Sequence, residues 1–229
     1  MGRVKDIRLK VIPHKIANDF VERHHYSGTY SRKSNLHFGV FLDGSLHGAM
    51  QYGSPIDKNK VISLVKDTGW NEMIELHRMA FNEYLPKNSE SRALAVSFKL
   101  IQKNAPHIKW ILSYSDAAQC GDGAIYRATG FYLTAIKKNT SMLKMPDGSV
   151  VCDKSLNNAN NAVTGKTAGW WKKNGAKLIS GYQVRYIYLI DKSCKLNVPV
   201  IPFEKIDEVG AGMYKGEKVT YKERNAPVA

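Results

Sequence analysis

Two apolar segments joined by a tight-turn sequence constrain the fold of this chain most. Residues 36–42 and 46–52 are both largely apolar, and they flank Asp43-Gly44-Ser45. An Asp-Gly pair between two such segments is typical of a β-hairpin, because both residues tolerate the positive φ that a tight hairpin turn requires. The sequence therefore predicts two adjacent antiparallel strands, so the sheet that contains them is not purely parallel.

Strands and helices alternate through the rest of the first 190 residues. Further strands are expected at residues 7–12, 73–81, 108–115, 131–136 and 182–190. Helices are expected at residues 15–25 and 124–129, and a longer helix begins near Ser89 and ends at Pro106. Residues 53–71 are predicted to be a loop or an irregular crossover. This order predicts an α/β (α+β) fold, in which a mixed central sheet is flanked by helices.

The chain length of 229 residues fits one domain with a sizeable insertion. We predict a single domain over residues 1–190, with residues 139–181 inserted before the last strand and residues 191–229 as a C-terminal extension. A hydrophobic content of 43% with 24% charged residues is enough to bury a core. This composition excludes a disordered chain.

Cysteine content and hydropathy indicate where the protein acts. Cys120, Cys152 and Cys194 are an odd and widely spaced set, which disfavours a disulfide framework and a four-cysteine zinc site. Apolar runs all fall short of the roughly 20 residues that cross a bilayer. The N-terminal segment also lacks the apolar stretch of a secretion signal. We expect a protein of the reducing cytoplasm with no membrane partner.

The charge of the chain points to polyanionic partners. Lys and Arg number 34 against 20 Asp and Glu, which leaves a net charge of +14. This excess must lie on the surface, where it attracts DNA, RNA or an anionic membrane face. A plainer alternative is that the lysines only keep the protein soluble. An imbalance of this size favours nucleic acid.

Arg78 is the first candidate for a functional residue. Strand alternation places it on one face with Ile74, Leu76 and Ala80. A guanidinium among apolar neighbours needs a carboxylate, phosphate or carbonyl partner. Arg78 is therefore a candidate for binding a substrate or a donor, and the alternative is an arginine that pairs with the protein itself.

The segment AIYRATGF, which follows a strand and a polar loop, resembles a motif of the GNAT N-acetyltransferase fold. In that family a short helix carries a Tyr a few residues before a Gly-aromatic pair, and its hydroxyl can protonate the departing thiolate. Tyr126 holds that position, with Gly130-Phe131 as the pair. This resemblance implies a GNAT-like catalytic domain over residues 1–190. The alternative is a tyrosine that packs at the edge of a helix.

Longer blocks give a more specific resemblance. The blocks HHYSG, LHFGVFLDG, RMAF, LPKNSESRALA and SDAAQCGDGAIYRATGF are similar to the Mom family of phage Mu and its relatives. The resemblance covers residues 4–138. It implies a phage-encoded enzyme of the host cytoplasm that attaches a carbamoylmethyl group to adenine N6 in phage DNA, which protects the DNA from host restriction. The family's important residues would fall on His25, Tyr26, Arg78, Ser91, Asp116 and Tyr126.

The chemistry requires groups of these types. The lone pair of adenine N6 is delocalised into the ring, so a base must take its proton and the donor carbonyl must be polarised. His25 and Asp116 are candidate bases, and Asp116 accepts the amine proton or orients His25 in our hypothesis. Tyr126 acts as the acid toward the leaving group. An alternative for Asp116 is that it caps the following helix or turn.

The sequence leaves the donor open between acetyl-CoA and glycyl-tRNA. Ordinary acetyltransferases bind a pyrophosphate through a glycine-rich turn, whereas Asn88-Ser89-Glu90-Ser91-Arg92 has no glycine and carries a carboxylate that opposes phosphate. Ser91 and Arg92 could offset that charge, so they are candidates for binding the donor. Glycyl transfer from tRNA, followed by migration, also gives a carbamoylmethyl product. No metal is predicted, and a site built from His25, Asp116, Cys120 or Asp122 remains an alternative.

A target adenine must be unpaired before its N6 amine can react. Either single-stranded DNA or a flipped adenine satisfies this requirement. Tyr26 and Tyr30 are candidate stacking platforms. Others lie in the segment GKTAGWWKKNGAK, where Trp170 and Trp171 precede Lys172 and Lys173. The alternative is a tryptophan pair buried in the inserted region.

Two competing functions remain open at this point. One is an acetyl-CoA-dependent N-acetyltransferase that acts on a small molecule or a protein, on the same fold. The other is a basic DNA-binding protein without catalysis. The expected convergence of His25, Arg78, Asp116 and Tyr126 at strand ends argues against the second function. Oligomeric state is not indicated by the sequence.

Overall fold

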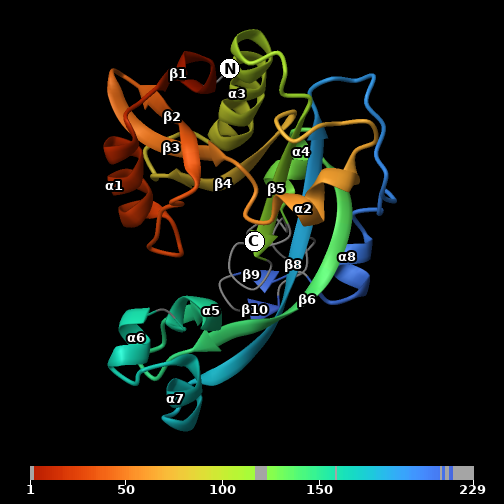
Figure 1. Cartoon of the computed structure of the whole chain (residues 1–229). Helices are drawn as coiled ribbons and strands as arrows, with labels where there is room; N and C mark the ends of the chain where they lie inside the picture. The colour runs from red at the N-terminus through yellow and green to blue at the C-terminus, as the bar shows by residue number, and fades with distance from the viewer. Residues whose placement is uncertain (1–2, 117–122, 158, 212, 215–216, 219–229) are drawn as a thin grey trace, which may run out of the picture. The chain divides into compact units, whose positions relative to one another are not determined.

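The protein is described here as a computed structural model (Figure 1). The structure describes residues 3–116, 123–157, 159–211, 213–214 and 217–218. These residues form two compact units. The first unit comprises residues 3–114, 123–135 and 185–203, and the second comprises 115–116 with the described parts of 136–184 and 204–218.

Eight strands form one sheet of mixed direction, in the order β1-β2-β3-β4-β5-β8-β6-β7. The strands are β1 (Arg8–Val11), β2 (Ser34–Leu42), β3 (Ser45–Gly53), β4 (Met73–Phe81), β5 (Trp110–Asp116), β6 (Tyr132–Lys144), β7 (Val150–Cys152) and β8 (Lys177–Leu189). β1 to β4 pair successively antiparallel, whereas β4 and β5 pair in parallel. The predicted hairpin is confirmed, and Asp43 and Gly44 take φ values of 52° and 81° at its turn. The predicted α/β class with a mixed sheet is confirmed as well.

Helices of varied length connect these strands. The α-helices are α1 (His14–His24), α2 (Lys58–Val61), α3 (Ser89–Asn104), α4 (Ala124–Ala128), α5 (Asp153–Leu156), α6 (Ala159–Val163), α7 (Ala168–Lys173) and α8 (Lys205–Glu208). Two 3-10 helices, η1 (Arg3–Asp6) and η2 (Ile62–Leu64), and a two-stranded sheet of β9 (Met213–Tyr214) and β10 (Glu217–Lys218) complete the described elements. None of the described helices is both long and apolar enough to span a membrane.

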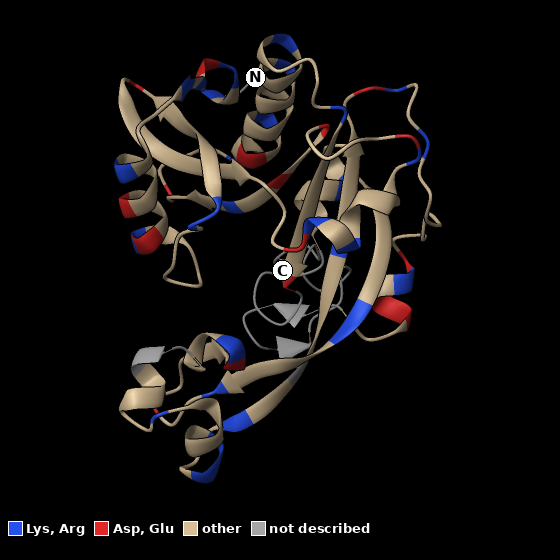
Figure 2. Ribbon diagram, in the orientation of Figure 1, with Lys and Arg blue, Asp and Glu red and all other residues tan. Residues whose placement is uncertain are grey.

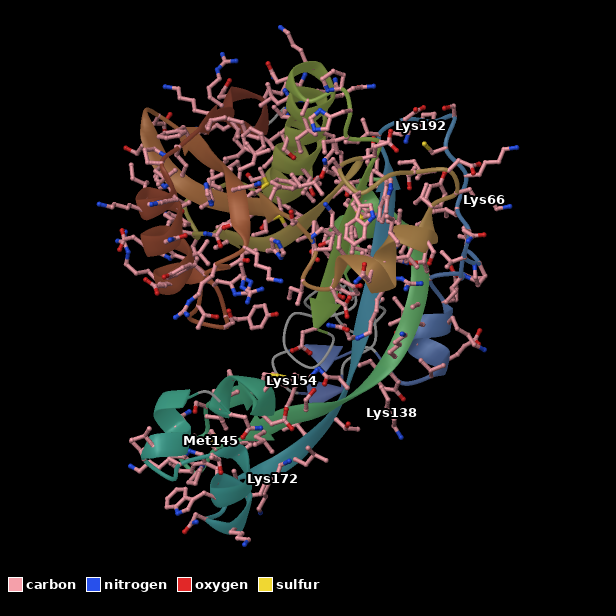
Figure 3. The ribbon with its side chains drawn as sticks, viewed as in Figure 1. Lys66, Lys138, Met145, Lys154, Lys172 and Lys192 are labelled. Atoms are coloured by element: carbon pink, nitrogen blue, oxygen red, sulfur yellow. The ribbon has the colours of Figure 1, made fainter. Side chains whose placement is uncertain are left out.

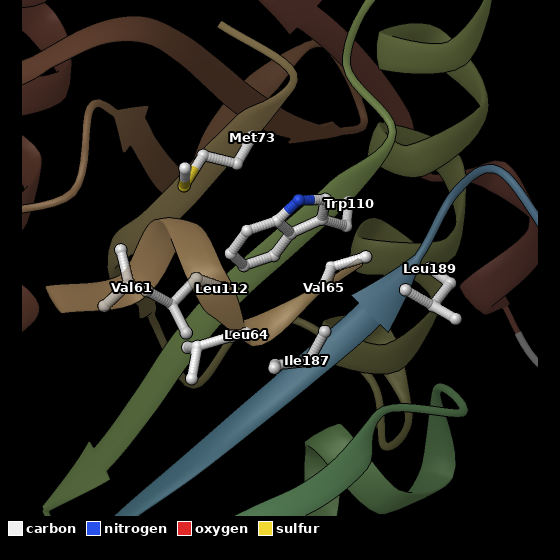
Figure 4. Packing of buried hydrophobic residues seen from close by; sticks show 8 residues of the cluster. All are labelled: Val61, Leu64, Val65, Met73, Trp110, Leu112, Ile187 and Leu189. Carbon is white, nitrogen blue, oxygen red and sulfur yellow. The ribbon is translucent and has the colours of Figure 1, made fainter. Parts of the chain in front are cut away.

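One face of the first unit is covered by the segment that includes α2 and η2 (Figure 4). Trp110 lies at its centre, completely buried, and its indole N–H donates to Thr68 Oγ1 at 3.1 Å. The cluster consists of Val61, Leu64, Val65, Met73, Trp110, Leu112, Ile187 and Leu189. The prediction that residues 53–71 are a loop or an irregular crossover misses these short helices, because a single turn is too short to produce a periodic hydrophobic pattern.

α1 and α3 bring apolar side chains against the first unit's strands. From α1, Phe20 and Val21 pack against Ala49 and Ala80. The stripe predicted on the longer helix is also found, because Leu94, Phe98 and Ile101 of α3 are buried. Since Ala80 shares a strand face with Arg78, α1 covers the face of β4 that carries this arginine.

The second unit has a small core of its own. Leu143, Met145, Ala168 and Ala176 are buried there, with Val151, Leu156 and Trp171 packed against them. β6 and β8 extend into this unit and are longer than the predicted strands at residues 131–136 and 182–190. Many of their added residues are polar, and Lys137, Lys138 and Lys177 are exposed, so the hydrophobic pattern does not reveal these extensions.

Candidate active site

His25 lies directly after α1, where the backbone leaves the helix with φ −86° and ψ 137°. Its Nδ1 accepts a hydrogen bond from the Ser27 backbone N–H at 3.2 Å and lies 2.8 Å from Ser27 Oγ. A backbone N–H can only donate, so Nδ1 is the acceptor and the proton of the neutral ring is on Nε2. His25 therefore presents an N–H donor at Nε2.

The same imidazole resists protonation. Burial and, to a lesser extent, the positive charge of Arg78 together lower the pKa of His25 to about 3. An unfolded chain binds this proton near pH 6.5, whereas the folded chain does not. The contribution of His25 to stability is thus present above pH 6.5 and is lost as the pH falls toward 3. At neutral pH the ring is uncharged.

Arg78 in β4 is held by the loop that follows His25. Its Nε donates to the Thr29 carbonyl at 3.1 Å, and its Nη1 donates to the His77 carbonyl at 2.8 Å. Ser27 Oγ also lies 3.2 Å from Thr29 Oγ1. A chain of contacts through Ser27 and Thr29 therefore links the imidazole to the guanidinium. The carbonyl partners expected for Arg78 are supplied by the protein itself.

Gln51 anchors this loop and was missed by the sequence analysis. It lies directly opposite Arg78 in the β3–β4 register and is completely buried. Its Nε2 donates to Asn18 Oδ1 at 2.7 Å, and its Oε1 accepts from the Ser31 N–H at 3.0 Å. A buried amide must be satisfied, so both bonds tie α1 and the loop to β3. The available signal was a glutamine that directly follows the apolar residues Ala49 and Met50 in a predicted strand.

Tyr126 in α4 is connected to the same strand from another direction. Ser113 Oγ lies 2.9 Å from the Tyr126 hydroxyl and 3.2 Å from the Leu76 carbonyl. Leu76 precedes Arg78 by two residues on β4, a rise of about 7 Å. The Tyr126 ring also stacks on Tyr186, with centroids 4.8 Å apart. Within the first unit, His25 and Arg78 both contact the loop after α1, whereas Tyr126 is linked to β4 only indirectly, through Ser113 of β5.

Asp116 is the last residue of β5 and is partly buried. It belongs to the second unit, whereas the other three predicted groups belong to the first. Cys120 and Asp122, which were considered as metal ligands with His25 and Asp116, lie outside the described residues. Within the described ranges, no three or more His, Cys, Asp or Glu side chains are grouped closely enough to hold a metal ion.

The start of α3 does not fit a pyrophosphate. Ser91 Oγ donates back to the Asn88 carbonyl at 3.1 Å, so it is engaged by the helix itself. Glu90 adds a carboxylate to the first turn. Arg92 is exposed, and its backbone N–H donates to the Asn88 carbonyl at 3.1 Å, as the helix requires. The two donor-binding candidates Ser91 and Arg92 therefore lie beside a helix start that lacks the features of a coenzyme A cradle.

The aromatic candidates differ in exposure. Tyr26 is 50% exposed and its ring lies against His25, with centroids 4.2 Å apart, whereas Tyr30 packs against the apolar cluster under α1. In the second unit Trp170 is exposed, and Trp171 packs on the core of that unit. Lys172 and Lys173 are both exposed. Tyr26 and Trp170 are thus the candidates with an accessible ring.

Comparison with known proteins finds partial similarity to solved structures. Two solved enzymes are similar in structure: the ribosomal-protein-S18-alanine N-acetyltransferase of Escherichia coli and a spermidine/spermine N-acetyltransferase of Vibrio cholerae. They are 11% and 8% identical, each with a TM-score of 0.47. The alignments cover 81% and 84% of this chain, and 94% and 97% of those chains.

Sequence comparison then identifies the family. The pattern of the Mom protein family matches residues 6–205, so the chain belongs to the Mom family. The methylcarbamoylase Mom of Escherichia phage Mu is 34% identical over 128 residues, which are 56% of this chain and 53% of that protein. The chain thus matches about half the length of this curated relative. The predicted family resemblance is confirmed.

The electrostatic coupling between Arg78 and His25 can be measured directly. Replacement Arg78→Gln removes one of the two causes that depress the pKa of His25. We expect this pKa to rise from about 3 toward 6.5 without reaching it, because burial remains. Nuclear magnetic resonance titration of the histidine rings would record the change. His37 is the internal control, since burial and His14 lower its pKa and Arg78 does not. An unchanged His25 titration would contradict the coupling.

Proposed function

We propose that this protein is a transferase that converts adenine N6 in DNA to N6-carbamoylmethyladenine, which would protect phage DNA from restriction. The observation that carries the proposal is the neutral His25 beside Arg78, with the Tyr126 hydroxyl linked to the same strand through Ser113. Membership of the Mom family and similarity to a protein named methylcarbamoylase support the choice of reaction. The net charge of +14 supports a nucleic acid substrate.

The geometry favours His25 as a hydrogen-bond donor. Its Nδ1 accepts from the Ser27 N–H, so Nε2–H is the ring group that can donate to a substrate, and it cannot accept a proton in this tautomer. A neutral imidazole donor, with the positive Arg78 nearby, would polarise the carbonyl of the acyl donor as negative charge develops on oxygen. We propose Asp116 as the base, as the family resemblance implies. Tyr126 would protonate the leaving group.

Glycyl-tRNA is the donor that we favour. The N6 nitrogen attacks the glycyl ester carbon, the carbon–oxygen bond to the tRNA ribose breaks, and the N6 proton leaves to the base while the ribose oxygen takes a proton from Tyr126. The free glycyl amine then attacks ring carbon 6, and the bond between that carbon and the amide nitrogen breaks. The product carries N–CH₂–CO–NH₂ on carbon 6 without any oxidation or reduction. The poor fit of the α3 start to pyrophosphate supports this donor over acetyl-CoA.

Reconstitution with isotopically labelled glycine tests the proposal. Purified protein, an adenine-containing single-stranded oligonucleotide and glycyl-tRNA would be combined, and the nucleosides analysed by mass spectrometry. We expect deoxyadenosine to gain the mass of one labelled glycyl residue, and ribonuclease treatment of the tRNA beforehand to abolish this gain. Formation of the product after ribonuclease treatment of the tRNA would rule out glycyl-tRNA as the donor. Acetylation of a peptide by acetyl-CoA, with deoxyadenosine unmodified, would instead support an N-acetyltransferase. If neither reaction gives a product, a non-catalytic DNA-binding protein is supported.

A further inference from the structure

Residues 136–184 of the second unit carry charges of mostly one sign. Residues 136–184 contain eight lysines and two aspartates, with no arginine or glutamate. All eight lysines are exposed. Figure 2 shows the blue segments along β6, β8, α5 and α7, and Figure 3 shows Lys138, Lys154 and Lys172 among them. A surface with this charge attracts phosphate groups.

Both aspartates of this region are already engaged. Asp147 accepts hydrogen bonds from the N–H and the hydroxyl of Ser149 at 2.9 and 2.6 Å. Asp153 of α5 lies 3.6 Å from Lys172 Nζ of α7. Lys172 is therefore partly neutralised within the unit. The other lysines carry the excess charge that is available to a partner.

The two tryptophans of α7 differ in exposure, and their rings meet edge to face with centroids 4.9 Å apart. Thr167 caps this helix and accepts from the Trp170 N–H. Ala168 and Trp171 are three residues apart, and both pack on the core of the unit. Trp170 and Lys173 are also three residues apart and are both exposed, with 39% of Trp170 accessible. Ala168 and Trp171 thus join α7 to the core of the second unit, whereas Trp170 and Lys173 present an indole and an ammonium group to solvent.

Lysines also border α7 on both sides along the chain. Lys166 lies just before the capping Thr167, and Lys177 begins β8 shortly after α7. Leu178, next to Lys177, is 55% exposed. Exposed aromatic and aliphatic groups among lysines match the surfaces that bind unpaired nucleic acid, where bases stack and phosphates are neutralised. Lysine is a point charge without the planar fork of arginine, so such a surface contacts the backbone without selecting a base.

We propose that Trp170, Lys166, Lys173 and Lys177 form a binding surface for single-stranded DNA, which we call the Trp170 surface. Trp170 stacks on an unpaired base, and the lysines contact successive phosphates. The choice of DNA rests on the proposed function, in which the reacting adenine is unpaired. The Trp170 surface holds the strand independently of the groups that perform the chemistry.

Binding of the full-length protein to a fluorescein-labelled oligothymidine tests this surface. Oligothymidine contains no adenine, so its binding does not depend on the modification reaction. We expect Trp170→Ala to weaken binding about tenfold or more, because base stacking on an aromatic ring has that magnitude. We expect Lys173→Gln to reduce the slope of log K against log salt by about 0.7, the value for one phosphate contact on a single strand. The matched control Lys103→Gln replaces an exposed lysine of α3 and leaves both quantities unchanged.

Several outcomes would overturn the Trp170 surface. Unchanged affinity of Trp170→Ala would do so, provided that its thermal unfolding matches the parent protein, as the exposure of this side chain predicts. An equal loss in the Lys103→Gln control would show that only net charge matters. Tighter binding of oligouridine than of oligothymidine would assign the surface to RNA. If deoxyadenosine is never modified but these binding effects hold, the proposed function fails and the Trp170 surface stands.

Discussion

Replacement of Asp116 by asparagine is expected to abolish adenine modification. The amide has nearly the same shape as the carboxylate but cannot accept the N6 proton. Because Nδ1 of His25 is occupied by Ser27, the imidazole cannot take over this role. We expect the rate to fall by roughly 10²- to 10⁴-fold, the usual contribution of a general base. Nucleoside mass spectrometry after single-turnover reaction would give the rate.

A control variant separates catalysis from charge. Asp147→Asn removes the same charge at a carboxylate that only holds Ser149, and it should leave the rate unchanged. Binding of Asp116→Asn to oligothymidine should equal that of the parent protein. Full activity in Asp116→Asn would remove this residue from the mechanism. A parallel loss of DNA binding would make it a structural residue.

Replacement of Gly123 by alanine is expected to damage both stability and activity. Gly123 precedes α4 with a φ of +74°, and a Cβ there would lie 2.6 Å from the Tyr186 hydroxyl. The left-handed backbone costs an alanine about 1–2 kcal/mol, and forced overpacking adds about 1–3 kcal/mol. The Tyr186 ring must move, and Tyr126 stacks on it. Chemical denaturation and the modification rate should therefore both show the change.

Gly44→Ala distinguishes the two causes. Gly44 has a φ of +81°, and a Cβ there would meet no atom within 4 Å. This variant should show the backbone cost of about 1–2 kcal/mol alone, with the modification rate unchanged. If Gly123→Ala is no more destabilised than Gly44→Ala and remains active, the Tyr186 ring does not hold Tyr126 in place.

Sequence patterns predicted the elements that have long apolar segments or a regular apolar stripe. The hairpin around Asp43 and Gly44 joins two largely buried apolar strands, and α3 carries the stripe. The short helices α2 and η2 produce no such pattern, since each is about one turn long. The extensions of β6 and β8 beyond the predicted strands were also missed, because polar residues such as Lys137, Lys138 and Lys177 interrupt the apolar pattern there. The predicted domain boundaries at residues 139, 181 and 191 stay predictions.

Some features of the candidate site were predicted from the sequence, and others were not. Arg78 was predicted because a guanidinium on an apolar strand face is unusual, and the structure supplies its carbonyl partners from Thr29 and His77. The tautomer of His25 could not be predicted, since it depends on a backbone N–H two residues later that turns back toward the ring. Gln51 forms hydrogen bonds with both Asn18 of α1 and Ser31 of the loop after α1. Contacts between segments that are distant in the sequence leave no local pattern.

The first strand also affects how the protein behaves at high concentration. β1 is at one end of the sheet, is only four residues long and carries Arg8 and Lys10. Unprotected outer strands recruit further chains, whereas short length and positive charge repel a second copy of the same strand. Such repulsion opposes fibril growth from this side of the sheet, even when the protein accumulates quickly.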